Sequence, residues 1–388
     1  MIISCYYNFW SINMSETKQR NSSIEILKVF GMLLIVISHI ALTMNGINDE
    51  ITKEALFHIS NASKDINSII LRIFAYGGYV GNAIFFSCSS WFLCNTKELK
   101  KEKIWQMITD IWFISVIIAL IYFLSPVQVS SSYYIQTLFP TILGNNWYTT
   151  CYLLFYGFVP LLNKALDITD KKQYERIVIA LILIYFGIGF VLPKNFQTNY
   201  LIMFFVIHII VFYIRKFRED IYKNIKLNSI ILSVSVACLL LLIIVLNLVG
   251  LKIQLLESKM MWFGNFQNPF IIAIALSLLM IFLNKTFYNR FINSVSSVSL
   301  FIYIIHENLI FSSYTRSEIA SYLLNAYGRN NVITITLLFA FVLFIITTII
   351  SFVYQKTIMK LTGKISLRLS SAYDLLVEKL IKLINKNS

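Results

Sequence analysis

Long apolar runs separated by short charged loops constrain this chain more than any other feature. Of its 388 residues, 57% are hydrophobic and 15% are aromatic, and the mean hydropathy is +0.71. The runs hold about 16 to 24 residues each, and a helix needs about 20 to cross the hydrocarbon core of a bilayer. Within lipid every backbone polar group must be satisfied, so such runs form helices. The sequence therefore predicts an all-α polytopic membrane protein.

We predict a bundle of about ten transmembrane helices. The stretch before the fourth span is interrupted by Pro140 and Gly144, which predicts a re-entrant or interfacial segment there. The predicted spans are 26–44, 70–93, 105–125, 147–163, 177–193, 199–215, 229–250, 269–284, 296–313 and 332–355.

The distribution of Lys and Arg predicts how the chain is oriented. With the amino terminus placed in the cytoplasm, 25 of the 33 basic residues fall on the inner side and 8 on the outer side. Cytoplasmic loops of membrane proteins carry such an excess, so both termini are predicted to be cytoplasmic. The formal charge of +14 lies in these loops, without a basic, aromatic-studded domain, and so does not suggest nucleic acid.

Three regions are predicted along the chain: a cytoplasmic segment 1–25, a membrane domain 26–355 and a basic tail 356–388. The first thirteen residues lack the basic region of a signal peptide, whereas Met14 opens an ordinary polar amino terminus, so Met14 is the expected natural start. The tail has an amphipathic pattern, YDLLVEKLIKLI, and is predicted to lie along the anionic inner membrane surface.

His39 lies in the middle of the first apolar run, with Lys28 eleven residues before it and Glu25 just outside the run. Eleven residues rise roughly 16 Å, about three helical turns, so Lys28 lies near the membrane edge and His39 lies deep inside on nearly the same face. An ionisable residue at that depth is a functional-site hypothesis, and imidazole is the usual general base near neutral pH. The alternative is a buried residue that joins two helices. For His39 we favour function.

His306 lies about as deep in the ninth predicted span as His39 lies in the first, and Glu307 follows it directly. Because both spans run outward, the two imidazoles could share a depth, and functional and structural roles are equally open for His306. His208 stands alone among apolar residues, so a structural role is favoured there.

Further polar candidates at membrane depth are Asn82, Ser89 and Glu307. Trp147 and Tyr148 begin the fourth span, where such residues are usually interfacial anchors. The five cysteines are scattered, and the sequence contains no metal-ligand pattern, so no metal is expected.

Four segments, in this order, resemble the acyltransferase 3 family, integral membrane acyltransferases that modify cell-surface glycans. The first helix of that family resembles RNSSIEILKVFGMLLIVISHI, and its second resembles GGYVGNAIFFSCSSWFL. Its WY-containing segment resembles NNWYTTCYLLFYGFVPLLN, and its late histidine helix resembles SVSSVSLFIYIIHENLIF. The resemblance runs from about Arg20 to Tyr354.

The resemblance implies that His39 is the catalytic histidine, that Glu25 fills the family's acidic position and that His306 is its late histidine. Lys28 stands where the family commonly has arginine, which keeps the charge but loses the planar fork for phosphate. Ser90 departs from the family pattern, because it replaces a glycine of the second helix. Trp147 and Tyr148 match the family's WY pair, and the resemblance implies that they bind the cofactor together with Lys28.

The leading hypothesis from these residues is an O-acyltransferase of the cell membrane, expected to be bacterial. It would move an acyl group, most readily acetyl, from acyl-CoA such as acetyl-CoA to a hydroxyl of a cell-envelope polysaccharide, for example an exopolysaccharide, or its lipid-linked precursor. Its expected partners are acyl-CoA, the glycan acceptor, membrane lipids and glycan-assembly proteins, and no nucleic acid. Outer loops 45–69 and 126–146 would face the acceptor.

Two alternatives remain open: a polysaccharide exporter or flippase, and a non-catalytic subunit of a glycan-assembly complex. An exporter needs a polar pathway that opens alternately to both faces. The intramembrane polar groups are few and lie in the first, second, fourth and ninth spans, which favours a reaction chamber.

Overall fold

The computed structural model describes residues 20–44, 66–192, 200–253 and 261–386, and these residues form helices and turns without strands. The elements are α1 (Ser22–Met44), α2 (Ile66–Leu93), α3 (Lys101–Phe123), α4 (Ser131–Leu138), α5 (Trp147–Ile168), α6 (Lys171–Leu181), η3 (Ile182–Ile188), α7 (Gly189–Val191), α8 (Tyr200–Phe217), α9 (Glu219–Tyr222), α10 (Ile225–Lys252), α12 (Pro269–Leu283), α13 (Arg290–Ser297), α14 (Ser299–His306), η4 (Phe311–Arg316), α15 (Ser317–Tyr327), η5 (Arg329–Asn331), α16 (Val332–Thr357) and α17 (Met359–Lys386).

Eight helical stretches in the described part of the chain are long and apolar enough to cross a membrane. They hold 18 to 29 residues each and coincide with eight of the ten predicted spans. The all-α polytopic class is therefore confirmed. The total of ten spans and the cytoplasmic location of both termini stay predictions.

The predicted span 269–284 corresponds to a helix shorter than the others. Helix α12 has 15 residues and is therefore about 22 Å long. Asn268 caps its start by accepting a hydrogen bond from the Phe270 N–H at 3.0 Å. The turns at 261–268 before it include buried residues such as Phe266 and Gln267, as irregular backbone at membrane depth requires.

The predicted span 296–313 is not one continuous helix. Helix α13 ends at Ser297, α14 ends at His306, and the helical path resumes at Leu309 and continues into η4 at Phe311. Asn308 starts the new segment, because its side-chain oxygen accepts hydrogen bonds from the N–H groups of Ile310 at 3.1 Å and Phe311 at 3.4 Å. The predicted span runs across this break because apolar residues resume at Leu309, directly after the polar residues His306, Glu307 and Asn308.

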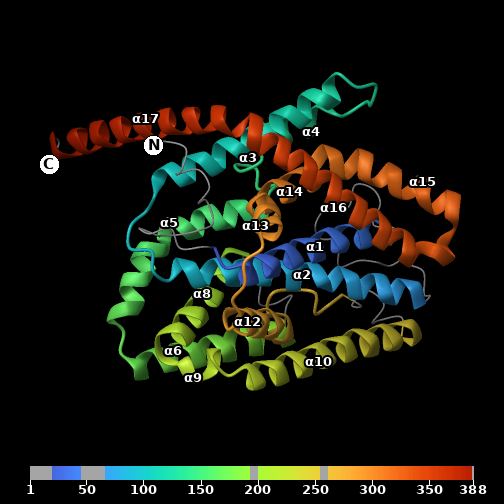
Figure 1. Ribbon diagram of the computed structural model, residues 1–388, viewed down its shortest axis with the longest axis horizontal. Coiled ribbons are helices and arrows are strands. Elements are labelled where there is room, and N and C mark those ends of the chain that lie inside the picture. The colour runs from blue at the N-terminus through green and yellow to red at the C-terminus, as the bar shows by residue number, and fades with distance from the viewer. Residues whose placement is uncertain (1–19, 45–65, 193–199, 254–260, 387–388) are drawn as a thin grey trace.

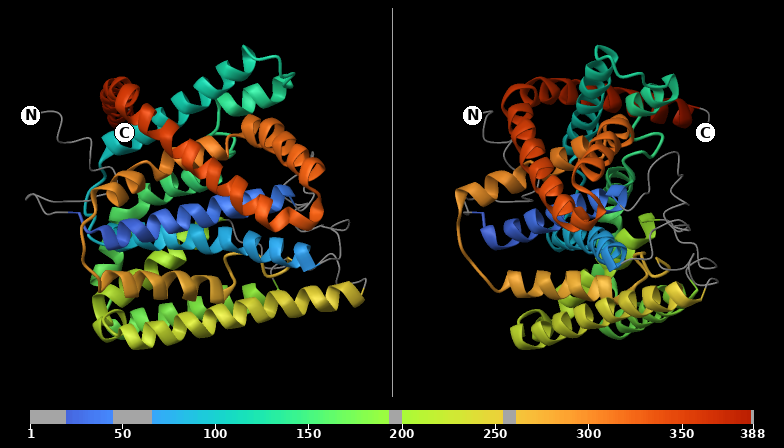
Figure 2. Two further views of the ribbon diagram at one scale, coloured as in Figure 1. Left: turned by 45° about the vertical axis from the view of Figure 1, so that its right-hand side comes forward. Right: turned by 90° about the vertical axis from the view of Figure 1, so that its right-hand side faces the viewer.

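Helices α1 and α2 occupy the centre of the bundle, between α14 and α16 on one side and α12 and α10 on the other (Figures 1 and 2). Small residues let their backbones approach closely. A Cβ atom at Gly81 would overlap the carbonyl oxygen of Gly31, and one at Gly78 would overlap the Ser38 hydroxyl. Ser38 also donates a hydrogen bond to the Ala75 carbonyl at 3.0 Å. This contact fixes α1, and with it the first-span histidine, against α2.

Helix ends that the charge pattern assigns to the inner side lie together. At the start of α1, Asn21 donates a hydrogen bond to the Lys285 carbonyl, just after α12, at 2.9 Å. On α5, Asn163 donates to the Leu93 carbonyl, at the end of α2, at 2.8 Å. We call this end of the bundle the basic end.

The basic tail begins as a helix packed against the bundle. Asp110 of α3 accepts hydrogen bonds from Thr362 of α17 at 2.6 Å and from Tyr354 of α16 at 2.8 Å. Farther along α17, Leu376 and Leu380 are exposed, as contact with a membrane surface would require. That location stays a prediction, and the proposed start at Met14 lies outside the described residues.

We expect the Gly81→Ala variant to unfold at a lower temperature than the unchanged protein. The added methyl would also stand 2.9 Å from Ile35 Cγ1, and overpacking of this kind costs about 1–3 kcal/mol. Gly157→Ala in α5 is the matched control, because nothing lies within 4 Å of its added Cβ. Thermal unfolding in detergent, followed by size-exclusion chromatography, measures both; equal melting temperatures would contradict the close contact.

Candidate active site

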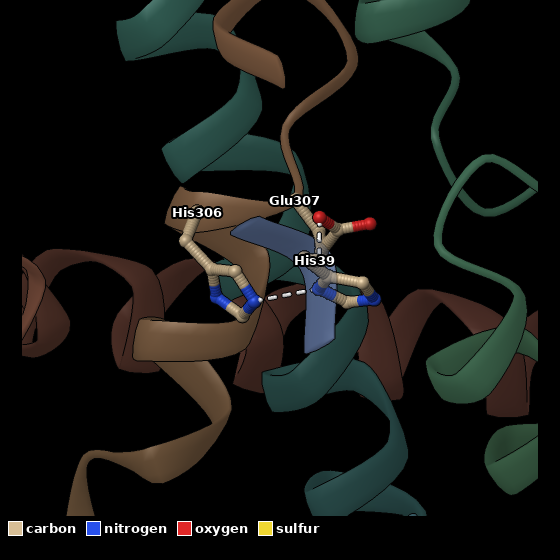
Figure 3. Close-up of side chains that lie close together, drawn as sticks. All are labelled: His39, His306 and Glu307. Atoms are coloured by element: carbon tan, nitrogen blue, oxygen red, sulfur yellow. Dashed lines mark hydrogen bonds and ion pairs between the residues drawn. The ribbon is translucent and has the colours of Figure 1, made fainter. Parts of the chain in front are cut away.

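The break after α14 brings three ionisable side chains together (Figure 3). His39 Nδ1 lies 3.1 Å from His306 Nε2 and 2.9 Å from Glu307 Oε1. The two imidazoles, predicted to share a depth, are thus in direct contact. We call His39, His306 and Glu307 the histidine cluster.

Hydrogen bonds determine which ring nitrogens of the neutral imidazoles carry protons. His306 Nδ1 lies 2.7 Å from the Ile302 carbonyl oxygen, which can only accept, so Nδ1 of His306 is the donor. Its Nε2 then carries a lone pair and accepts from His39 Nδ1–H. Glu307 accepts from the same Nδ1–H. His39 Nε2 is therefore the unprotonated nitrogen, as a general base requires.

The arrangement leaves the basic nitrogen of His39 facing away from its partners. Figure 3 shows His39 Nε2 on the side opposite His306 and Glu307. The His306 side chain is fully buried, whereas the side chains of His39 and Glu307 are 21% and 24% exposed. The protein therefore encloses His306 completely, whereas part of the His39 side chain reaches the molecular surface.

Arg316 fixes the carboxylate of the histidine cluster. Its guanidinium forms an ion pair with Glu307 and also donates to the His306 carbonyl at 3.3 Å. That carbonyl belongs to the last turn of α14, where the helical ladder ends. Arg316 thus satisfies a backbone group freed by the break and orients Glu307 toward His39.

The histidine cluster also has the composition of a metal site. One donor atom from each residue lies within 4.8 Å of the others, and imidazole and carboxylate are common ligands. The guanidinium on Glu307 places a positive charge next to that position, which opposes cation binding. The expected absence of a metal stays a prediction.

Glu25 and Lys28 form a second group, nearer the basic end and separate from the histidine cluster. Glu25 contacts Lys28 Nζ at 3.3 Å and Arg20 at 2.8 Å, and it accepts a hydrogen bond from Ser296 of α13. Lys28 is 1% exposed, so it does not extend to the interface. Fourteen residues of α1 separate Glu25 from the first-span histidine, a rise of about 21 Å. Glu25 therefore cannot contact that imidazole.

Trp147 and Tyr148 begin α5 as predicted, but they pack inside the bundle. Trp147 contacts Tyr200 and Phe266, with ring centroids 4.5 and 5.8 Å away. Tyr148 is buried, its ring lies 6.0 Å from that of Tyr303, and its hydroxyl has no hydrogen-bond partner in the described part of the chain. The pair is thus more than an interfacial anchor.

The polar candidates on α2 make local or structural contacts. Asn82 donates to the Gly78 carbonyl, and Ser89 donates to the Phe85 carbonyl, both at 3.0 Å within the same helix. Neither of these hydrogen bonds involves a residue of the histidine cluster.

The serine that replaces the family glycine has a structural partner. Ser90 lies 3.0 Å from His208 Nδ1, and His208 Nε2 lies 2.8 Å from Asn163. The chain of contacts joins α2, α8 and α5, which accounts for an imidazole alone among apolar residues.

Sequence reasoning missed Arg316 and Ser296 as site residues. Arg316 lies three residues beyond the predicted span 296–313, and the available signal was a basic residue nine positions after Glu307. Ser296 belongs to the serine-rich stretch SVSSVS, where no pattern distinguishes one hydroxyl from another. Only the packing of α13 against α1 selects it.

The fold and the histidine cluster define a helical membrane protein with two imidazoles and a carboxylate in contact inside its bundle. A sequence profile described as an acyltransferase domain, Acyl_transf_3, matches residues 21–356. The chain belongs to the acyltransferase 3 family and is a membrane acyltransferase. Neither the curated proteins nor the solved structures include a match to it.

We expect Lys28→Met to destabilise the protein, because a buried pair that loses one partner typically costs about 3–5 kcal/mol. Glu25→Gln should destabilise it as well. The double variant should be more stable than the sum of the two losses predicts. A double-mutant cycle of thermal unfolding in detergent measures this coupling; strictly additive losses would show that the pair contributes nothing.

Proposed function

We propose that the protein is an O-acyltransferase that transfers an acyl group, most simply acetyl, from acyl-CoA to a hydroxyl of a cell-envelope polysaccharide or its lipid-linked precursor. The observation that carries this proposal is the histidine cluster. His39 has one nitrogen held by His306 and Glu307 and the other directed away from them, in a family of membrane acyltransferases.

In the proposed reaction, His39 Nε2 accepts the proton of the acceptor hydroxyl as its oxygen attacks the thioester carbonyl carbon. A C–O bond forms, the tetrahedral intermediate collapses and the C–S bond breaks. The proton on the imidazolium then passes to the departing thiolate, so that the products are the ester and free CoA. Glu307 stabilises the imidazolium that forms transiently, as the carboxylate of a catalytic triad does.

The donor is proposed to enter from the basic end, where Lys28 lies about 16 Å along α1 from His39. Glu25 already contacts the Lys28 ammonium. An ammonium carries three donors, so this contact does not by itself prevent a second one with a donor phosphate. Trp147 and Tyr148 remain proposed cofactor contacts, and the buried Tyr148 hydroxyl supports a polar contact within the bundle.

The acceptor is proposed to approach from the opposite end. There, α4 of loop 126–146 lies beside the segment that carries Arg316: the rings of Tyr133 and Tyr314 are 5.3 Å apart. The backbone N–H of Ser130 also donates to the Tyr314 hydroxyl at 3.2 Å. Aromatic rings with polar edges suit saccharides, which supports this loop as an acceptor-facing element. Loop 45–69 lies largely outside the described residues.

We expect His39→Ala to abolish acyl transfer, and Glu307→Gln to lower kcat about 100-fold with little change in KM for the donor, because the carboxylate acts on the imidazolium of the transition state. Glu307→Asp should recover part of the loss. The assay uses purified protein in detergent with labelled acetyl-CoA and an oligosaccharide acceptor, where no gradient exists to drive transport.

Melting temperatures of these variants serve as the control for folding. Full activity in a folded His39→Ala protein would remove His39 from the mechanism. If the acceptor made no difference to the assay signal of any variant, and glycan acetylation were normal in cells that carry these variants, the exporter or the non-catalytic subunit would be favoured.

Metal removal tests the second use of the same side chains. We expect dialysis against EDTA to leave activity unchanged and elemental analysis to find less than about one zinc ion per ten chains, because the Arg316 charge disfavours a cation at Glu307. If activity were lost with the metal and restored by zinc, a metal site would replace the proposed proton transfer at His39.

A further inference from the structure

A cavity of about 560 Å³ lies at the basic end, between the C-terminal ends of α2, α5 and α8. Its walls come from residues 94–97, 160–168 and 212–216. Ala75 of α2 marks the depth of the first-span histidine, because Ser38 contacts its carbonyl. From Ala75 to Cys94 the helix rises about 28 Å. The cavity is therefore separate from the histidine cluster.

The lining of this cavity carries an excess of positive charge. Four basic side chains line it, and Asp167 is the single carboxylate among its lining residues. Asp167 lies 3.7 Å from Lys216, and no ion pair in the described part of the chain engages Lys97 or Lys164. Elsewhere at this end, Arg218 pairs with Asp220 and Lys223 pairs with Glu219. The cavity lining therefore carries more positive than negative charge.

One of these cations is held in a fixed position. The Arg215 guanidinium donates to the Trp91 carbonyl and lies 5.1 Å from the centroid of the Trp91 ring. An immobilised guanidinium loses little further freedom on binding, and its planar set of N–H donors matches phosphate oxygens. Arg215 therefore provides a pre-oriented anion contact.

A buried hydroxyl at the cavity lacks a partner. Thr96 is 6% exposed, and its Oγ1 makes no hydrogen bond within the described residues. Its neighbour Asn163 is satisfied by the carbonyls of Leu93 and Thr96. A buried hydroxyl without a partner is destabilising, and a bound oxyanion would remove that cost by accepting its hydrogen bond.

We propose that this cavity is a phosphate-binding site, in which Arg215, Lys97 and Lys164 balance the charge and Thr96 donates a hydrogen bond. Two sources supply this chemistry: the head group of an anionic phospholipid and the phosphate of a soluble nucleotide. Leu161 and Ile168 of α5 are 68% and 81% exposed, so the wall of the cavity adjoins the lipid-facing surface. None of the residues that carry this proposal belongs to the histidine cluster.

Two binding experiments on the full chain distinguish the sources. Calorimetry with ADP in an uncharged detergent tests the soluble phosphate. Native mass spectrometry of protein from nanodiscs of phosphatidylglycerol and phosphatidylcholine, in equal amounts, tests the phospholipid. Binding in the first alone assigns a soluble ligand, retention of phosphatidylglycerol in the second alone assigns a lipid, and competition between the two assigns their shared phosphate.

The variants Arg215→Gln and Lys164→Gln should each weaken the observed binding about tenfold, because each removes a charge-assisted contact. Thr96→Val, which keeps the shape and removes the hydroxyl, should weaken it about threefold. Lys226→Gln is the matched control, since it removes the same charge at the same end of the bundle but does not line the cavity. His39→Gln should leave binding unchanged.

Absence of binding in both experiments would overturn the proposal. So would equal effects of Lys164→Gln and Lys226→Gln, since a general surface charge would then explain the result. Arg215 also supports the Trp91 backbone, so if its variant fails to fold, Lys164→Gln and Thr96→Val decide the outcome.

Discussion

A polar group at membrane depth must find its partner inside the protein, because hydrocarbon offers no hydrogen bonds, and this requirement shapes the whole bundle. Arg72 of α2 is buried and donates to Asn247 of α10 at 2.6 Å, which ties two helices far apart in sequence. The contacts of His208 with Ser90 and Asn163 tie α8 and α5 to α2 as well. The same requirement assembles the histidine cluster.

Helix α1 carries Glu25 and His39, and the segment from α13 to Arg316 supplies a partner for each. Ser296 of α13 reaches Glu25 near the basic end, and His306 and Glu307 reach His39 deeper in the bundle. These two helical paths therefore meet at two levels. On its other face α1 packs closely against α2, so a shift of His39 would require both α1 and α2 to move.

The break after α14 sets the geometry of the histidine cluster. In a continuous helix, Glu307 would follow His306 around the axis by about 100° and point away from it. Ending α14 at His306 allows both side chains to contact one nitrogen of His39. Arg316 then balances the carboxylate and satisfies the freed carbonyl. Irregular backbone at membrane depth here has a specific role in positioning charge.

The sequence by itself determined the membrane class and eight of the spans, and it singled out His39 and His306 as candidates, because hydropathy and intramembrane charge are local properties of the chain. It also indicated the family from four collinear segments. Tertiary structure alone decided that Glu307, and not Glu25, partners His39, and that Lys28 is buried beside Glu25. It also revealed Arg316, Ser296 and the cavity at Thr96. These features depend on which helices pack together and where α14 ends, and contacts between residues hundreds of positions apart leave no periodicity in a single sequence.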